Sequence, residues 1–310
     1  MMSNSKNHRK QHNHHAHTQN IRGEKLLWVT LLNFLISLVQ IVGGVLSNSL
    51  SLISDAIHNL GDTSAIFIAF LAGKRADKKP DVQKTFGYKR IEILAALFNA
   101  VVLIAICIFL FVEAYERLKN PQAIKGGAML TVAIFGLLAN LISVLVLQKE
   151  KSHNLNIRAA YLHLLGDTLS SVAVIVGGIA ILIWQVYWLD PLVTVAVGIY
   201  IIRHAWGVVR QTVNILMQAT PHHVSIQEIK QSVEALPQVE NIHHLHIWQM
   251  NEELTLLEAH LNMRQDLLLS EAQIVRHDVE TLLKEKFGIE HITLQIEYKG
   301  CEENNELIFR

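Results

Sequence analysis

Two six-residue segments with the same pattern, residues 58–63 (HNLGDT) and 163–168 (HLLGDT), lie inside long apolar stretches of the chain. In each segment a histidine precedes an aspartate by four residues. On a helix this spacing places both side chains on one face, one turn apart. Two such helices facing each other would supply two imidazoles and two carboxylates, the ligand number and types of a tetrahedral Zn²⁺ site. We therefore predict that these side chains bind one metal ion: His58, Asp62, His163 and Asp167.

The cost of burying the two aspartates is a second argument for metal binding. An aspartate at the centre of a bilayer costs about 2.5 to 3.5 kcal/mol on insertion scales. No lysine or arginine occurs in residues 50–73 or 159–184. A cation or a proton must therefore neutralise the carboxylates. The simpler alternative, in which each histidine only hydrogen-bonds the aspartate of its own helix, explains one pair better than it explains two.

The composition indicates a membrane protein with a polar extension. The chain has 310 residues, of which 51% are hydrophobic and 17% charged, and its mean hydropathy is positive. Its formal net charge is zero and it carries no nucleic-acid-binding motif, so we expect no nucleic-acid partner. The two cysteines, Cys107 and Cys301, form no pattern of a disulfide framework or a thiolate metal site.

Six apolar segments near the length of a membrane-spanning helix follow one another, and the bilayer is therefore an expected partner. They cover residues 26–46, 50–73, 91–112, 125–147, 157–184 and 188–214, within an expected six-helix domain at 26–217. Fifteen lysines and arginines flank the segments on one side, whereas only Arg117, Lys119 and Lys125 flank them on the other. By the positive-inside rule both termini lie in the cytoplasm. We expect no cleavable signal peptide, because the N-terminus is polar and histidine-rich and the first apolar segment is long enough to span.

The first 25 residues are predicted to be a disordered cytoplasmic tail, because they are polar and cannot bury a core. The tail carries a cluster of histidines: His8, His12, His14, His15 and His17. Imidazole is a common Zn²⁺ ligand, so this tail either collects metal for the membrane site or is inert.

Other polar residues of the apolar segments suggest supporting roles. Asp55 lies on the same stripe as His58 and Asp62, and we interpret it as a residue supporting the site, a vestibule charge or a proton relay. Gly61 and Gly166 each directly precede the motif aspartate, which predicts close approach of a neighbouring helix. Interhelical hydrogen bonding is the better interpretation for the single amides Asn33, Gln40, Asn99 and Asn140.

From residue 218 the composition is that of a small folded domain, expected at 218–300 and followed by a flexible tail at 301–310. The patterns predict helices at 224–236 and 270–287 and strands at 243–249, 254–261 and 289–298. Ser225 and Ser270 are the expected N-caps, with Glu228 completing a capping box at the first. The order α-β-β-α-β predicts an α+β layer with one sheet face covered by helices and the other able to pair with a copy or bind a ligand.

Together these segments resemble the cation diffusion facilitator family, in particular its zinc-exporting branch of bacterial zinc/cadmium transporters. The resemblance covers about residues 26–300. It rests on residues 43–62, which include Asp55, His58 and Asp62, and on residues 86–92 (FGYKRIE), 154–167 (NLNIRAAYLHLLGD) and 244–248 (HLHIW).

The resemblance implies a proton-coupled exporter that works as a homodimer, with the two His-Asp pairs as transport ligands. It also implies a ferredoxin-like, metal-binding cytoplasmic domain, whose ligand positions match His243, His260 and Glu297. Zn²⁺ would then be both the substrate and a regulatory ligand, with no organic cofactor. After the second span this chain keeps Asp81 but has Lys84 and Tyr88 where some members carry further histidines, so we expect no metal site there. The loop at 148–156 is short and holds only His153.

The chemistry supports exchange of metal for protons. Histidine, with an ordinary pKa of about 6.5, binds metal only when neutral, so Zn²⁺ and protons compete for the two imidazoles. Two nitrogens and two oxygens also suit Cd²⁺, Co²⁺ or Ni²⁺ but not Mg²⁺ or Ca²⁺. A passive metal channel and a membrane-bound metal sensor remain as alternatives. An intramembrane metalloenzyme is disfavoured, because no His-Glu-x-x-His motif occurs. The short loops favour a bacterial plasma membrane.

Overall fold

The computed structural model describes residues 30–76, 78–148 and 155–300, without the side chains of Ala69, Leu147 and residues 155–164. The predictions for the histidine tail, for His153 and for the C-terminal tail lie outside the described residues. The described part of the chain divides into two compact units, one within residues 30–68 and 98–207 and the other within residues 69–97 and 208–300. We describe each unit by itself.

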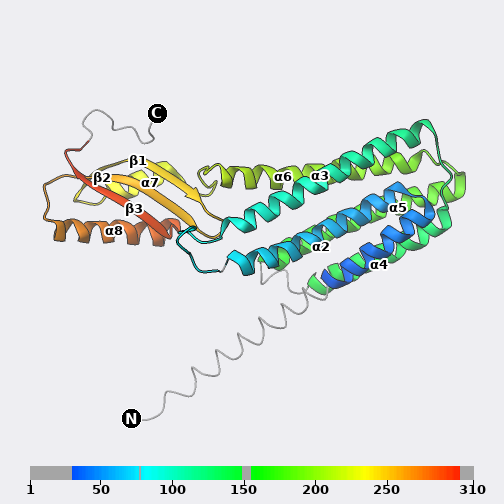
Figure 1. Ribbon diagram of the computed structural model, residues 1–310, viewed down its shortest axis with the longest axis horizontal. Coiled ribbons are helices and arrows are strands. Elements are labelled where there is room, and N and C mark those ends of the chain that lie inside the picture. The colour runs from blue at the N-terminus through cyan, green and yellow to red at the C-terminus, as the bar shows by residue number, and fades with distance from the viewer. Residues whose placement is uncertain (1–29, 77, 149–154, 301–310) are drawn as a thin grey trace, which may run out of the picture. The chain divides into compact units, whose positions relative to one another are not determined.

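Long helices make up the first unit and continue into the second (Figure 1). A first helix at Thr30–Ser47 is followed by α2 (Leu50–Ala76), α3 (Arg90–Lys119), α4 (Gly126–Gln148), α5 (Leu155–Trp184) and α6 (Leu189–Leu216). Within the described ranges, five of them are long and apolar enough to cross a membrane. The remaining one, α2, has 27 residues, but it carries Asp55 and Asp62 in its interior and Lys74 and Arg75 in its last turn.

Helix α3 continues seven residues beyond its predicted end at residue 112. This last part is amphipathic and ends the apolar run, which is why the hydropathy pattern missed it. Arg117 donates to Glu113 Oε1 at 3.0 Å and to the backbone oxygen of Asn48 at 2.7 Å. These two contacts fix the additional turns against the turn that precedes α2.

A buried carboxylate from α6 caps the start of α2. Asp190 is fully buried, and its oxygens accept hydrogen bonds from the backbone amides of Leu50 (2.7 Å) and Ser51 (3.2 Å). The hydroxyls of Ser49 and Ser51 donate to the same carboxylate at 2.7 and 2.6 Å. A helix N-terminus has unpaired amides and partial positive charge, so a carboxylate is stabilising there. The position of α2 along α6 is thereby fixed.

The C-terminal domain in the second unit is a three-stranded sheet with two helices. Its strands are β1 (Val239–Gln249), β2 (Thr255–Met263) and β3 (His291–Tyr298), in the order β1-β2-β3. β1 and β2 are antiparallel, and β2 and β3 are parallel. The helices α7 (Ile226–Glu234) and α8 (Leu269–Phe287) pack on one face, where Ile229, Val279 and Leu283 join alternate strand residues in a buried core. We call the opposite side the second face.

The element order α-β-β-α-β is as predicted, with differences at the ends. Ser225 caps α7 as expected, accepting from the amide of Glu228 at 3.3 Å. The prediction that Ser270 caps the next helix was wrong: α8 begins at Leu269, and the side chain of Glu271 accepts from the Leu268 amide at 3.1 Å. β1 begins four residues before its predicted start, because a register shift between Val239 and Asn241 interrupts the alternation in that part of the strand.

Candidate metal centre between the membrane helices

The first motif pair and the aspartate of the second meet in the helical unit. His58 Nδ1 lies 3.2 Å from Asp62 Oδ2, and His58 Nε2 lies 3.3 Å from Asp167 Oδ1. One candidate ligand atom from each of these three side chains lies within 4.8 Å of the other two. The side chains of His58 and Asp167 are each 3% exposed, whereas that of Asp62 is 28% exposed. The imidazole therefore lies between two carboxylates from different helices. His58 and Asp167 are buried, and among the described side chains the site is accessible only from the side of Asp62.

The fourth predicted ligand, His163, lies on α5 four residues before Asp167, but its side chain is outside the described part of the chain. The helical backbone alone places the two residues on one face, one turn apart. The structure thus brings together His58, Asp62 and Asp167, and the participation of His163 stays a prediction.

Asp55 is tied to neighbouring helices by hydrogen bonds. It is 1% exposed, and it accepts from Ser170 Oγ at 2.8 Å, Ser171 Oγ at 3.1 Å and Gln40 Nε2 at 3.1 Å. The amide of Asn140 in turn donates to Ser171 Oγ at 3.3 Å. These contacts join α2 to α5 beside the cluster, and they favour support of the site over a solvent-facing vestibule charge.

The two motif glycines allow close approach of other helices, as their position predicted. A Cβ atom on Gly61 would lie 3.2 Å from Leu103 Cδ1 of α3. A Cβ atom on Gly166 would lie only 2.6 Å from the hydroxyl of Tyr200 on α6. A side chain at residue 166 would therefore displace Tyr200.

Tyr200 is a residue of the site that sequence reasoning missed. Its ring meets that of His58 edge to face, with the centroids 6.1 Å apart, and it also contacts His204 at 5.6 Å. A single tyrosine in an apolar helix has no spacing signal that marks it as functional. The only available signal was that His204, another intramembrane histidine, follows it by one helical turn.

The predicted ligands of the C-terminal domain also converge. His243 and His260 are register partners on β1 and β2, and both reach Glu297 on β3. His260 Nδ1 lies 2.9 Å from Glu297 Oε1, and His243 Nε2 lies 3.5 Å from Glu297 Oε2. Candidate ligand atoms of all three fall within 4.8 Å of one another. Three neighbouring strands thus contribute one ligand each on the second face.

The environment of His243 suits a metal ligand. Its Nδ1 lies 2.9 Å from the amide oxygen of Asn241. An amide oxygen only accepts, so Nδ1 carries the proton and the lone pair is on Nε2, which faces Glu297. Burial lowers the pKa of His243, and the neighbouring His260 and His244 lower it further, against the opposing effect of Glu297. The ring is therefore held in the neutral form that binds metal.

Asp81, in the loop after α2, makes local contacts. Its carboxylate accepts from the Tyr88 hydroxyl at 2.7 Å and from the backbone amides of Gln83 and Lys84 at 2.9 Å each. The hydrogen bond from Tyr88 is the main reason why the pKa of Asp81 lies below its usual range. This carboxylate stabilises a turn.

The helices and the buried His-Asp cluster define an integral membrane protein with a site suited to a divalent metal ion. Sequence comparison gives the family: the chain belongs to the cation efflux proteins. Residues 26–217 match the cation efflux transmembrane domain, and residues 221–299 match the cytoplasmic domain of the cation efflux protein.

Relatives of known name are similar over nearly the whole chain. The cadmium, cobalt and zinc/H(+)-K(+) antiporter of Bacillus subtilis is 36% identical over 298 residues, which cover 95% of each chain. The zinc transporter ZitB of Pectobacterium atrosepticum is 38% identical and covers 95% of this chain and 91% of its own. The metal cation efflux system protein CzcD of Cupriavidus metallidurans is 37% identical, with 94% of this chain and 91% of its own covered. These relatives are named as transporters, not enzymes.

Proposed function

We propose that this protein exports Zn²⁺ from the cytoplasm in exchange for protons, and that it also accepts Cd²⁺ and Co²⁺. The observation that carries the proposal is the buried imidazole of His58 between the carboxylates of Asp62 and Asp167. The names of the relatives, which include zinc transporters and a cadmium, cobalt and zinc antiporter, support the same substrate class.

In this proposal His163 completes a tetrahedral site of two nitrogens and two oxygens. The two carboxylates balance the charge of the ion, and the imidazoles favour borderline-soft metals over Mg²⁺ and Ca²⁺. Because α2 and α5 contribute one pair each, a small movement of one helix against the other changes how many ligands reach the ion. The four ligands together hold Zn²⁺, and separation of the α2 pair from the α5 pair releases it.

Protons couple to transport through the same side chains. An imidazole that binds a proton cannot bind metal, so each site that releases Zn²⁺ outside becomes able to take up protons there. The return of the protonated site to a more alkaline cytoplasm releases the protons and restores the ligands. A proton gradient directed inward would then drive metal outward.

The proposed architecture has six spans, with α2 as the sixth. Although α2 carries the acidic ligands, it is long enough to cross a bilayer, and the bundle can shield its polar face. Positive charge flanking the spans supports cytoplasmic termini. The short loops between the spans support a bacterial inner membrane location. The C-terminal domain is proposed to be ferredoxin-like, to bind Zn²⁺ as a regulatory ligand at His243, His260 and Glu297, and to form the homodimer that the family supports.

The decisive experiment measures Zn²⁺ uptake into everted or reconstituted vesicles with and without an imposed pH gradient. Wild-type uptake should require the gradient. Asp62→Ala and Asp167→Ala should each abolish Zn²⁺ uptake while the amount of folded protein stays normal. Asp81→Asn, which removes a carboxylate outside the cluster, is the matched control and should retain uptake. Uptake that survives both cluster replacements would show that the metal does not pass through this site.

The same vesicles separate an exchanger from a passive metal channel. An exchanger accumulates Zn²⁺ against its concentration gradient when protons flow the other way, whereas a channel only equilibrates the two sides. Movement of protons that accompanies each addition of Zn²⁺ can be followed with a pH-sensitive dye. A membrane-bound sensor would show neither flux.

A further inference from the structure

β1 contains a bulge that brings two consecutive histidines to the same face of the sheet. His243 pairs with His260 and His246 pairs with Glu258, so three steps along β1 oppose two along β2. The additional residue lies between them, and His244 adopts a left-handed backbone with φ of 51°. Such a conformation is uncommon for residues other than glycine, and bulges of this kind often redirect a side chain at a functional site.

Because of this bulge, an unbroken row of imidazoles crosses the second face. The ring of His244 stacks on that of His260, with centroids 4.7 Å apart and an interplanar angle of 24°. On its other side it meets His246 at 5.3 Å. The row begins at His243, which contacts His260 at 5.4 Å. His243 and His260 belong to the cluster with Glu297, whereas His244 and His246 extend beyond it.

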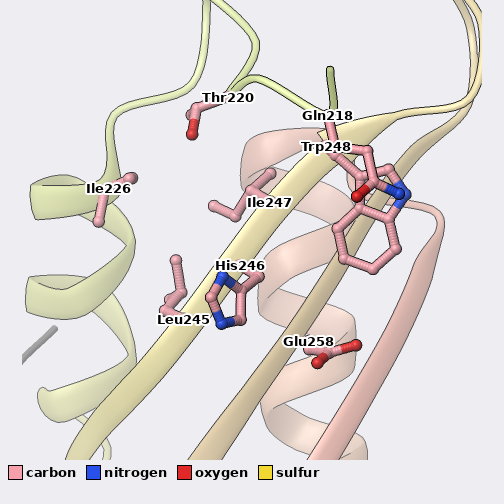
Figure 2. A pocket seen from close by; sticks show the side chains of 8 residues that line it. All are labelled: Gln218, Thr220, Ile226, Leu245, His246, Ile247, Trp248 and Glu258. Atoms are coloured by element: carbon pink, nitrogen blue, oxygen red, sulfur yellow. The ribbon is translucent and has the colours of Figure 1, made fainter. Parts of the chain in front are cut away.

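A carboxylate lies opposite the far end of the row. Glu258 is the direct cross-strand partner of His246, so the two side chains stand on one face with Cβ atoms about 5 Å apart. A hollow of about 350 Å³ opens along β1 (Figure 2). Its lining combines His246, Glu258, Trp248 and Gln218 with Thr220 and with Leu245, Ile247 and Ile226 of the apolar side. Glu258 is exposed and His246 partly so, which leaves both side chains room to turn toward an ion.

We propose that His244, His246 and Glu258 form a second metal-binding position in the C-terminal domain. It would take a divalent transition metal such as Zn²⁺ or Co²⁺, with two nitrogens, one oxygen and a water from the hollow as ligands. The first cluster already draws its ligand atoms from His243, His260 and Glu297. His246 and Glu258 face each other at a different register position, next to the hollow and away from Glu297. In this proposal the domain therefore holds two ions, one at each position.

The proposal explains why the bulge carries histidine. A regular strand would send the side chain of residue 244 into the apolar core with Leu245 on the opposite side. The left-handed residue instead adds one donor to the second face, next to the first cluster. His244 thereby lies between the two positions, in contact with ligands of both.

Counting bound ions in the full-length protein tests the proposal without measuring transport. The background variant carries Asp62→Asn and Asp167→Asn, and asparagine replaces the five tail histidines. These changes disable the proposed metal positions outside the C-terminal domain, namely the membrane cluster and the histidine tail. After equilibrium dialysis against Zn²⁺ and passage through a desalting column, the metal is counted by atomic emission. We expect two ions per chain in this background, and one after either His246→Ala or Glu258→Gln.

Three comparisons make the count decisive. His243→Ala combined with His260→Ala should also leave one ion, because it removes only the first position. His277→Ala, which removes an imidazole from the surface of α8, should leave two. A background count of one, an unchanged count in His246→Ala and Glu258→Gln, or loss of both ions in either variant would overturn the proposal. Replacing Zn²⁺ with Co²⁺ adds a visible spectrum, which should lose about half of its intensity in His246→Ala.

Discussion

At the scale of single residues, we expect the donor atoms of His58 to influence which ions the proposed membrane site accepts. The imidazole contacts one carboxylate through each of its nitrogens, so its replacement changes the donor set without changing the helices that hold it. Nitrogen donors favour Zn²⁺ strongly over Mn²⁺, whereas an all-oxygen environment reduces that preference.

His58→Asp should therefore relax selectivity. We expect Zn²⁺ affinity to fall by at least tenfold, because even indirect changes around a metal cost about 10- to 100-fold. Transport of Mn²⁺ or Cd²⁺ should rise relative to Zn²⁺. Competition between these ions in the vesicle assay measures the change, with His277→Asp on the surface of α8 as a control. An unchanged order of preference would mean that the imidazole is not a ligand.

His243 gives a pH dependence to the stability of the C-terminal domain. The folded protein holds its pKa below the ordinary value of about 6.5, so below that pH the unfolded chain binds more protons than the folded one. Stability from this group is complete above about pH 6.5 and is lost as the pH falls. In metal-free protein, His243→Asn should lose less hydrogen-exchange protection in β1 and β2 than wild type between about pH 7 and 5. An equal loss would contradict the assignment.

At the scale of helices and strands, close approach between α5 and α6 depends on Gly166. Adding a methyl group there places it 2.6 Å from the Tyr200 hydroxyl, and overpacking of this kind costs about 1 to 3 kcal/mol. Gly166→Ala should thus lower both thermal stability and transport.

Tyr200→Phe removes the atom that the new methyl group meets, so it should restore part of the loss in the double variant. The measurement is thermal unfolding in detergent. Unfolding is detected by the reaction of the buried thiol of Cys107 with a maleimide dye, in a Cys301→Ser background. Gly127→Ala, where no atom lies within 4 Å of the added Cβ, serves as the control. Identical losses in the single and double variants would locate the damage elsewhere.

The sequence predicted best where chemistry and periodicity coincide. The spacing of His58 and Asp62 on one helix needed only the 3.6-residue repeat, and the order of helices and strands in the C-terminal domain needed only the two periodicities of the sequence. Tyr200 and the cap from Asp190 escaped because each depends on contact between segments far apart in the chain. The bulge at His244 escaped as well, since local sequence does not show that a strand contains one residue more than its partner.

At the scale of the whole molecule, we expect the transport cycle to proceed without the histidine tail. Deleting residues 2–25 should leave the maximal rate of Zn²⁺ transport in the vesicle assay within about twofold of wild type, because the transport ligands remain. If the tail collects metal, the apparent KM should rise, with the largest effect at low Zn²⁺. Replacing its five histidines with asparagine should reproduce that rise, and an unchanged KM in both variants would show that the tail is inert.

The cap of α2 has a consequence for biosynthesis. Asp190, which accepts the amide hydrogens at the start of α2, is made about 140 residues after them. At a synthesis rate of about 5 to 20 residues per second, α2 waits roughly 7 to 28 s beside the translocon before its cap emerges from the ribosome. During that interval the most polar helix of the bundle must be retained by its neighbours or by the insertion machinery. A nascent chain that ends before α6 therefore contains both metal-binding motifs but lacks the group that fixes the first of them in place.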